Sequence, residues 1–380
     1  LILTWSEDGT ARLWRLDSWA EKQQLSHEDW VSGAAWNRDG SLLLTWDREG
    51  TARVWNTVNG IEQLRITPTD SVVAAAWNKD GNLILTWGSV GTVWDARSGA
   101  ELLRFTPGVS INGAAWNSND SLILTWSVLG ITQVWDARSG AELLRFTPGG
   151  SINGATWNSK DNLILTWSTD GTARIWDAAS GVELLRLSHD ASVTGAAWNR
   201  NDSRILTWSE DNTARVWDAT SGVELLRLKH SGWVDGAVWN GDESLILTWS
   251  SDSIARVWDV NSGAERLRLS HEDWISGAAW NRDGRFILTW GLEGTARVWE
   301  VDTGTIYFTL PGDDTPVTEA QWSQNERQIR LVTWGGLAGN FTLHMADLLD
   351  GACQRATRNF TWTEWLMYFP SQPYRIICDQ

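Results

Sequence analysis

Short apolar runs separated by polar turns recur along almost the whole chain. Within residues 192–228 the runs are SVTGAAW, SRILTW, TARVW and VELLRL, and the clusters between them are NRND, SEDN and DATSG. Short runs rich in β-branched and aromatic residues, bounded by Asn, Asp, Ser and Gly, predict strands joined by hairpins. Four such runs in succession predict one four-stranded antiparallel sheet.

The predicted sheet repeats with a fixed period. Tryptophans of one column lie 41 residues apart, at Trp135, Trp176, Trp217, Trp258 and Trp299. This period, with four strands per unit, is typical of a β-propeller. Two further columns close LTW, ending at Trp334, and GAAW or its variants, ending at Trp322. We interpret all three columns as core between neighbouring sheets, and we expect the LTW rings to reach the rim of one face.

Over residues 1–345 the units read H-x3-V, GAAWNxDG and LTWSxDGTARVWD in turn. This arrangement resembles the WD-repeat β-propeller family, which implies an all-β fold of four-stranded antiparallel blades. Seven units are complete and partial units stand before and after them, so we expect eight blades, with seven and nine as alternatives. The expected domains are a partial, N-terminally truncated blade in 1–29, propeller blades in 30–345 and a helical tail packed on the propeller in 346–380.

The resemblance also implies a hydrogen-bonded chain in each sheet, from a His before the sheet through a Thr and an acid to the third-strand Trp. Two sheets whose preceding loop has Thr-Pro instead of His carry Val90 and Leu129 at the acid position, whereas Asp170 is retained after Thr147 and Pro148. A buried polar group left alone costs about 1–3 kcal/mol, so both partners should be lost together. We therefore expect structural, non-catalytic chains at His189, Thr207, Asp211 and Trp217, at His230, Thr248, Asp252 and Trp258, and at His27 with Glu49 and His271 with Glu293.

Composition narrows the function classes. Lys and Arg total 31 against 47 Asp and Glu, for a net charge of −16, which argues against nucleic acid and anionic membranes as partners and favours a basic one. Glycine-rich phosphate loops, HExxH, CxxC and GxSxG motifs are missing, so we expect no catalytic residue, no cofactor and no metal site. The two cysteines, Cys353 and Cys378, make no disulfide framework, although they could pair with each other. Without an apolar run long enough to span a membrane, a cytoplasmic location is expected.

The loops that precede the sheets suggest a binding face. SHEDWVSG, KHSGWVDG and SHEDWISG carry a Trp outside the three columns, whereas TPTDSVVA, TPGVSING and TPGGSING carry no aromatic residue. In an eight-blade ring these Trp residues would form one arc, and neighbouring acids would suit a cationic group. The alternative is that each Trp covers its own first strand. The candidate binding residues are Trp30, Trp233, Trp274, Glu28, Asp29, Glu272 and Asp273.

Residues 346–380, the tail, lack the repeat pattern. Its apolar spacing predicts a helix near residues 348–356, and TWTE at 361–364 looks like the capping box of a second one. The tail is similar to that of bacterial multidomain WD-repeat signalling proteins, which implies an effector domain upstream in the same chain. We therefore expect a non-catalytic recognition or sensor module for a protein or peptide, with a structural scaffold as the alternative.

Overall fold

The computed structural model describes residues 2–5, 8–14, 21–68, 72–312, 314–323, 326, 328–334 and 338–342. Every regular element in these residues is a β-strand. The chain forms two compact units, Leu1–Arg266 and Leu267–Gln380. The expected tail helices and both cysteines lie outside the described residues. Within the part that is described, no helix has the length and apolarity to cross a membrane.

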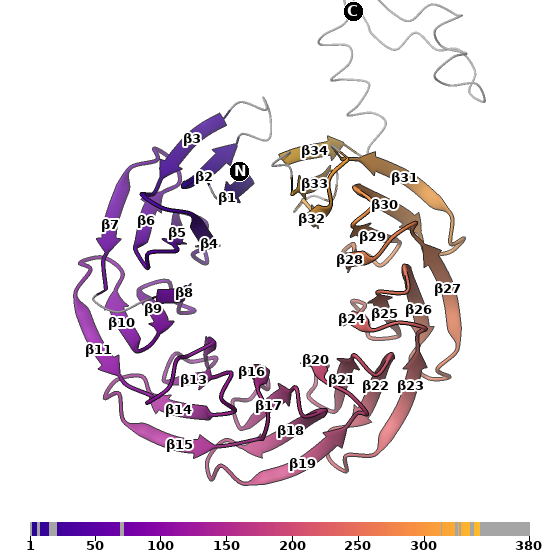
Figure 1. The fold of residues 1–380 in the computed structure, drawn as a ribbon, viewed down its shortest axis with the longest axis horizontal. Helices are drawn as coiled ribbons and strands as arrows, with labels where there is room; N and C mark the ends of the chain where they lie inside the picture. The colour runs from indigo at the N-terminus through magenta and orange to yellow at the C-terminus, as the bar shows by residue number, and fades with distance from the viewer. Residues whose placement is uncertain are drawn as a thin grey trace, which may run out of the picture. The chain divides into compact units, whose positions relative to one another are not determined.

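The first unit consists of antiparallel sheets that follow one another along the chain. In each complete sheet the first strand lies on the inner side and the fourth on the outer side (Figure 1). Its strands are β1 (Ile2–Trp5), β2 (Thr10–Trp14) and β3 (Glu21–Ser26) in a three-stranded sheet; β4 (Val31–Trp36), β5 (Leu42–Asp47), β6 (Ala52–Asn56) and β7 (Glu62–Ile66); β8 (Val72–Trp77), β9 (Leu83–Gly88), β10 (Gly91–Asp95) and β11 (Glu101–Phe105); β12 (Gly113–Trp116), β13 (Leu122–Trp126), β14 (Thr132–Asp136) and β15 (Glu142–Phe146); β16 (Ile152–Trp157), β17 (Leu163–Ser168), β18 (Thr172–Asp177) and β19 (Glu183–Ser188); β20 (Val193–Trp198), β21 (Arg204–Ser209), β22 (Thr213–Asp218) and β23 (Glu224–Lys229); and β24 (Val234–Trp239), β25 (Leu245–Ser250) and β26 (Ile254–Asp259).

The second unit continues the same pattern. The boundary between the units falls within β27 (Glu265–Ser270), the fourth strand of the sheet that begins with β24. Two further sheets follow: β28 (Ile275–Trp280), β29 (Phe286–Gly291), β30 (Thr295–Glu300) and β31 (Ile306–Pro311), then the three-stranded β32 (Val317–Trp322), β33 (Gln328–Thr333) and β34 (Ala338–Thr342). The described residues thus form seven four-stranded and two three-stranded sheets. The number of blades that close a ring stays a prediction.

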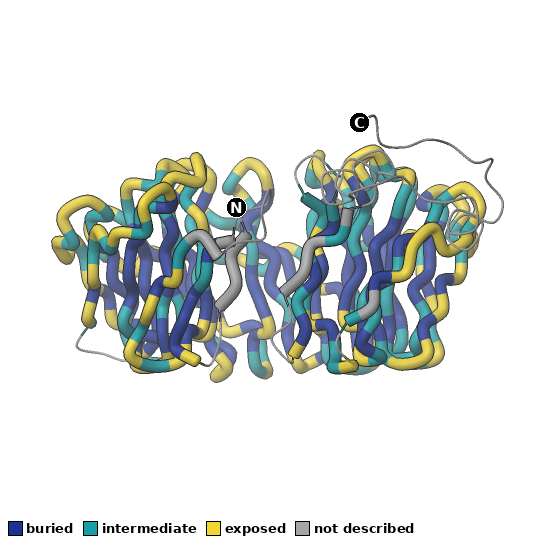
Figure 2. Tube along the Cα trace, turned by 90° about the horizontal axis from the view of Figure 1, so that it is seen from above, coloured by how far each residue is buried: buried dark blue, intermediate teal, exposed yellow. Residues whose placement is uncertain are grey.

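The core lies between consecutive sheets. Leu165, Ile175 and Leu187 of sheet β16–β19 pack with Ile205 and Trp217 of sheet β20–β23. The second and third strands are therefore mostly buried, whereas the fourth strands have exposed residues along their length and many turn residues at both ends are exposed (Figure 2). Because each sheet is covered on both faces, its inner strands are apolar on both sides. The third-strand tryptophans that are described, from Trp55 to Trp299, are all buried in these interfaces.

The Trp that closes LTW lies across a glycine of the first strand. Gly195 pairs in register with Trp208, and a β-carbon at Gly195 would lie 2.1 Å from the indole ring. Gly236 and Trp249 form the same pair in the next sheet. The glycine of GAAW is therefore a steric requirement of the Trp, because a side chain would occupy the ring's place.

Trp334 does not belong to this column, so that part of the sequence interpretation is wrong. In its sheet Val332 pairs with Glu319, as Trp208 pairs with Gly195 in sheet β20–β23. Val332, and not Trp334, therefore holds the column position. Trp334 follows the end of β33 and is exposed. Its backbone N–H donates a hydrogen bond to the Pro316 carbonyl at 2.8 Å.

Candidate functional site

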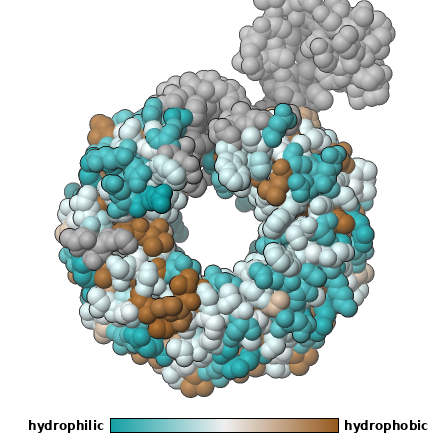
Figure 3. All heavy atoms as spheres, in the orientation of Figure 1, coloured by the Kyte–Doolittle hydropathy of each residue, from teal (hydrophilic) through white to brown (hydrophobic). Residues whose placement is uncertain are grey.

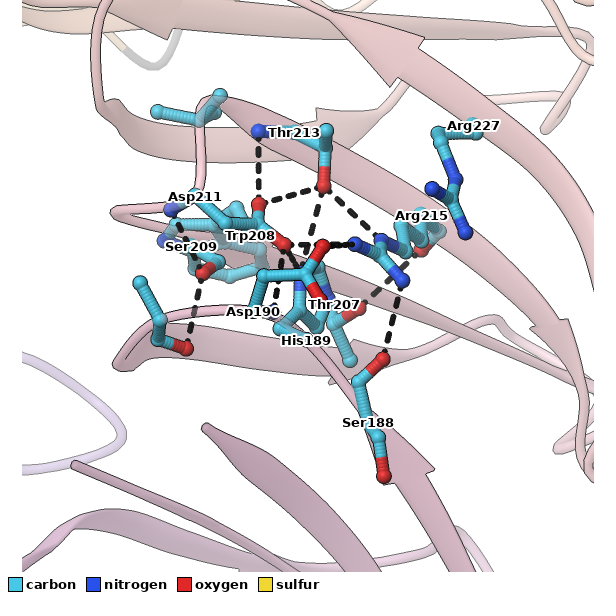
Figure 4. Close-up of polar contacts among 12 residues, drawn as sticks. Ser188, His189, Asp190, Thr207, Trp208, Ser209, Asp211, Thr213, Arg215 and Arg227 are labelled. Carbon is cyan, nitrogen blue, oxygen red and sulfur yellow. Dashed lines mark hydrogen bonds and ion pairs between the residues drawn. The ribbon is translucent and has the colours of Figure 1, made fainter. Parts of the chain in front are cut away.

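The polar groups of sheet β20–β23 converge on His189, which lies just after β19 (Figure 4). Its Nδ1 lies 2.8 Å from Asp211 Oδ2, and its Nε2 lies 2.7 Å from Thr207 Oγ1. Trp217 Nε1 donates to the same Thr207 oxygen at 2.8 Å. The structure thus brings together all four residues that the sequence placed in this chain, within one sheet.

Protonation states follow from these contacts. Burial lowers the pKa of His189 below its ordinary 6.5, against the raising effect of Asp211, so the imidazole is neutral. Burial by itself raises the pKa of Asp211, but hydrogen bonds from His189 and Thr213 outweigh it and the pKa lies well below the ordinary 3.8. Each donor then has one acceptor: Trp217 donates to Thr207, Thr207 to His189 Nε2, and His189 Nδ1–H to the Asp211 carboxylate.

Two other sheets repeat this arrangement. His230 lies 2.7 Å from Thr248 through Nε2 and 3.4 Å from Asp252 through Nδ1, and Trp258 donates to Thr248 at 2.8 Å. In the second unit, His271 lies 2.6 Å from Thr289 and 2.8 Å from Glu293, and Trp299 donates to Thr289 at 2.7 Å. Burial lowers the pKa of His271 to about 4. All three imidazoles are sequestered within their own sheets.

The acid partner of His27 is Asp47, and the expectation of Glu49 is wrong. His27 Nδ1 lies 2.8 Å from Asp47 Oδ2, while its Nε2 lies 2.7 Å from Thr45 Oγ1. Alternate residues of a strand point to the same side, so Asp47 accompanies Thr45 toward the imidazole. Glu49 lies in the turn beyond β5 and is exposed.

An arginine of the third strand completes each of these chains except that of His27, and sequence reasoning missed it. Arg215 Nη2 lies 2.7 Å from Asp211 Oδ2, with both side chains buried. Sheets β8–β11 and β12–β15, which lack the acid, have Thr92 and Gln133 at the arginine position. Where the other third strands read Ala-Arg, these two read Gly91-Thr92 and Thr132-Gln133. This change in the sequence could have identified the arginine as a partner of the acid. The equivalent ion pairs are Arg174 with Asp170 at 2.7 Å, Arg256 with Asp252 at 2.8 Å and Arg297 with Glu293 at 2.9 Å.

The retained Asp170 is explained by this ion pair. Sheet β16–β19 has Pro148 where others have His, but it keeps Arg174, whose guanidinium binds Asp170 at 2.7 Å. The acid therefore accompanies the arginine, whether or not the histidine is present. Removing the acid alone would leave the buried guanidinium with only its longer ion pair to Glu183 at 3.3 Å, which is unfavourable.

Two of the three complete sheets without His have a phenylalanine of the preceding sheet against the third-strand Trp. Phe105 lies 4.7 Å from Trp135 and Phe146 lies 4.5 Å from Trp176, measured between ring centroids. The Thr to Trp hydrogen bond is kept, with Trp135 Nε1 2.9 Å from Thr125 Oγ1. In these two sheets an aromatic stack accompanies the loss of the histidine.

The two candidate tryptophans of the first unit are exposed. Trp30 is 43% exposed, and its ring lies 5.2 Å from the guanidinium carbon of Arg48. Trp233 is 51% exposed, and its carbonyl accepts a hydrogen bond from Ser251 at 3.0 Å. Asp29 accepts the Trp30 backbone N–H at 2.8 Å, and Glu28 lies 3.2 Å from Arg65. The acids beside Trp30 therefore already have partners within the chain.

The candidate residues of the second unit lie between β27 and β28. Trp274 is half-buried, and its backbone N–H donates to Asp273 at 2.7 Å. Glu272 and Asp273 are both exposed. As for metals, no group of three or more His, Cys, Asp and Glu is placed to hold an ion in the portion of the chain that is described.

Comparisons with known proteins agree with this geometry. Four segments, 20–56, 142–177, 181–218 and 265–300, match the family described as WD domain, G-beta repeat. The C-terminal WD40 domain of Sif2 has a similar structure, with a TM-score of 0.67 and 20% sequence identity over 82% of this chain and 95% of that chain. The computationally designed protein Ika8 is similar at a TM-score of 0.65 and 20% identity, over 82% of this chain and 96% of its own. No curated protein sequence matches the chain significantly. The fold is that of a WD-repeat β-propeller, with four-stranded antiparallel blades.

Proposed function

We propose that this chain is a non-catalytic recognition module that binds a protein or peptide through the loops preceding its sheets. WD40 propellers generally mediate protein–protein interactions. The observation that carries the proposal is the exposure of the Trp30 and Trp233 side chains at equivalent loop positions. Tryptophan is enriched among the residues that dominate interface energetics, because it combines a large apolar surface with one polar group.

A sensor is favoured over a scaffold because the exposed face varies while the core is constant. The Thr to Trp hydrogen bond recurs in every complete sheet, from Trp55 and Thr45 to Trp299 and Thr289. The loops preceding the sheets instead change from His-Glu-Asp-Trp to Thr-Pro-Gly. A scaffold built from equivalent contacts would keep these loops alike.

The partner proposed from charge is basic, and the setting is a cytoplasmic signalling protein. A net charge of −16 attracts cationic segments and speeds their association. The likeness of the tail to bacterial multidomain signalling proteins supports an effector domain elsewhere in the same polypeptide. The buried imidazoles support the non-catalytic assignment, since their donors and acceptors are used within the sheets.

The test is a Trp30, Trp233 and Trp274→Ala variant used as bait in a lysate of the source organism, with captured proteins quantified by mass spectrometry. We expect the partners recovered by the native chain to be depleted. A matched control replaces Val182, Val223 and Ile306, which are exposed residues beside or in outer strands, by Ala. Undiminished recovery by the folded Trp variant would refute the binding residues. Loss of the same partners in the control would show that the capture is non-specific.

A further inference from the structure

Sheets β8–β11 and β12–β15 expose uncharged segments at the end of the sheets where the interconnecting loops lie. The segments are 72–73, 88–91, 105–112 and 126–131, and none of them contains Asp, Glu, Lys or Arg. The corresponding segments of sheet β20–β23, 188–194 and 208–213, contain Asp190, Glu210 and Asp211. These described segments therefore carry no charge, whereas Asp70, which precedes Val72 in the chain, lies outside the described residues.

Aliphatic side chains occupy these segments and reach solvent. Leu129 is 70% exposed, Val128 is 52% exposed and Val73 is 49% exposed, while Val90 and Val109 are partly buried. Apolar side chains gather over these two sheets in the space-filling view (Figure 3). We call these five residues the apolar sector.

Backbone contacts make the apolar sector continuous across the two sheets. Val72 pairs with Gly88, which places Val73 beside the turn that carries Val90. The Ile111 N–H donates to the Gly88 carbonyl at 2.6 Å, so the loop with Val109 lies against the same turn. Asn112 N–H donates to the Trp126 carbonyl at 2.8 Å, next to Val128 and Leu129.

Folding does not require these side chains to be apolar. The arginine position holds Thr92 and Gln133, so no third-strand guanidinium needs an acid in the turn. A Ser, Asn or Gly turn would meet that condition equally well, while exposed Val128 and Leu129 gain little from packing. Exposed apolar groups that gather in one place mark interaction sites on soluble proteins.

Acids stand on both sides of the apolar sector. On one side, Gly50 of the turn that carries the exposed Glu49 lies against Val72. On the other side, Ser168 Oγ donates to the Gly149 carbonyl at 2.6 Å, and the exposed Asp170 follows two residues later. Arg48 of the first flank lies over Trp30, and Arg174 of the second is buried and bound to Asp170. Asp170 is thus already neutralised by Arg174, whereas Glu49 is an exposed acid in the turn that lies against Val72. A cation is therefore favoured at the Glu49 flank, and apolar groups are favoured at the centre.

We propose that the apolar sector binds a peptide segment whose aliphatic or aromatic side chains cover Val73, Val128 and Leu129 and whose Lys or Arg residue lies at the end that faces Glu49. The inference rests on the proposed function and adds a surface and the chemistry of the partner. The apolar centre supplies affinity by burial, and Glu49 fixes the direction of the peptide and selects against acidic segments.

The test begins with the full chain, immobilised and panned against a phage-displayed library of short random peptides. Enriched peptides are then synthesised and titrated by fluorescence anisotropy against the native chain and V128D/L129D. We expect enriched peptides to have an apolar centre with Lys or Arg on one side, and to bind V128D/L129D at least about ten-fold more weakly. The matched control is V182D/L184D, which changes residues of 56% and 49% exposure at the outer strand β19 and should keep full affinity. Circular dichroism melting checks that each variant is folded, and V128T/L129S replaces the Asp variant if that variant is not.

The other outcomes separate the two proposals. Peptides that bind V128D/L129D as tightly as the native chain, or that are rich in Asp and Glu, would overturn the apolar sector and leave the recognition function standing. Failure to enrich any peptide would overturn the apolar sector as a peptide site, and the lysate capture would then decide the recognition function by itself. Sedimentation that shows a native dimer dissociated by V128D/L129D would assign the surface to a second copy. Faster hydrogen exchange of residues 347–380 in V128D/L129D would assign it to the chain's own tail. Either of these last results would also overturn the proposal.

Discussion

Sheets β20–β23 and β12–β15 have the same skeleton and opposite polar contents. Both bury a third-strand Trp that donates to a second-strand Thr, Trp217 to Thr207 and Trp135 to Thr125. Beyond that bond, His189, Asp211 and Arg215 in the first sheet correspond to Pro107, Leu129 and Gln133 in the second. The comparison teaches that the Thr to Trp bond belongs to the fold, whereas the polar chain above it is a replaceable unit.

Sheets β8–β11 and β12–β15 replace the whole unit, whereas sheet β16–β19 loses the histidine and keeps the Asp170 and Arg174 ion pair. The Arg215 side chain is buried and bound to Asp211, and Asp211 is bound to His189. Removing one member leaves a buried charge or donor unpaired, whereas removing all of them leaves an apolar site. The turn of the second sheet no longer has to carry an acid, and it carries Val128 and Leu129 of the apolar sector instead.

The largest expected effect comes from removing the acid. Asp211→Val removes the acceptor of His189 Nδ1 and the nearest counter-charge of buried Arg215, which keeps only its longer ion pairs to Asp190 and Glu224 at 3.4 Å each. This change should cost about 3–5 kcal/mol of unfolding free energy. The reverse change at the equivalent position, Leu129→Asp, adds an exposed charge and should cost no more than about 0.5 kcal/mol. Chemical denaturation of the two variants measures the difference. Similar losses at the two positions would break the distinction between the sheets.

Replacing the second-strand threonine, which both sheets have, should produce a smaller difference in stability between them. Thr207→Val removes an oxygen that serves both Trp217 and His189, whereas Thr125→Val removes one that serves Trp135. We expect the Thr207 variant to lose about 1–3 kcal/mol more than the Thr125 variant, because a second buried group loses its partner. The melting temperatures of the two variants give the comparison, and equal decreases would show that the bond to His189 contributes nothing.

Acidification should weaken the sheets that contain histidine. The folded pKa of His271 is about 4 against an ordinary 6.5, so the unfolded chain binds the proton more readily between these values. The contribution to stability is complete above the ordinary pKa and is lost as the pH falls toward about 4, amounting to about 1–2 kcal/mol between about pH 7 and about pH 5. The carboxylates have pKa values below the ordinary 3.8, so their loss belongs to a more acidic range.

Hydrogen exchange locates this pH effect. After correction for the intrinsic exchange rates, amide protection should fall in β28–β30 on acidification and stay constant in β12–β14, which contain no histidine. A His271→Asn variant serves as the control, since it removes the titrating group. Equal loss of protection in both sheets would show that the titration is global and not confined to the histidine chain.

Sequence alone predicted the strands, and its errors and omissions have physical causes. Alternation and turn residues gave the sheets because each strand has one buried stretch bounded by polar turns. Asp47 was missed because the repeat alignment pointed to the turn, whereas strand alternation places Asp47 beside Thr45. Arg215 was missed because the chain expected from the resemblance contained only a His, a Thr, an acid and a Trp, and the arginine of TARVW was given no partner. Trp334 was assigned to a column although its register is shifted, and register depends on pairing that the spacing of residues does not reveal.

The central claim is that stability and recognition reside in different residues, with the histidine chains serving the fold. The direct measurement is the unfolding free energy and the peptide affinity of His230→Ala and of V128D/L129D, determined side by side. We predict that His230→Ala loses about 1–3 kcal/mol of stability and keeps its peptide affinity, because the buried imidazole bonds Asp252 and Thr248 and does not belong to the apolar sector. We predict the opposite for V128D/L129D, with unchanged stability and weakened binding. A His230→Ala chain that loses binding at unchanged stability would contradict the account.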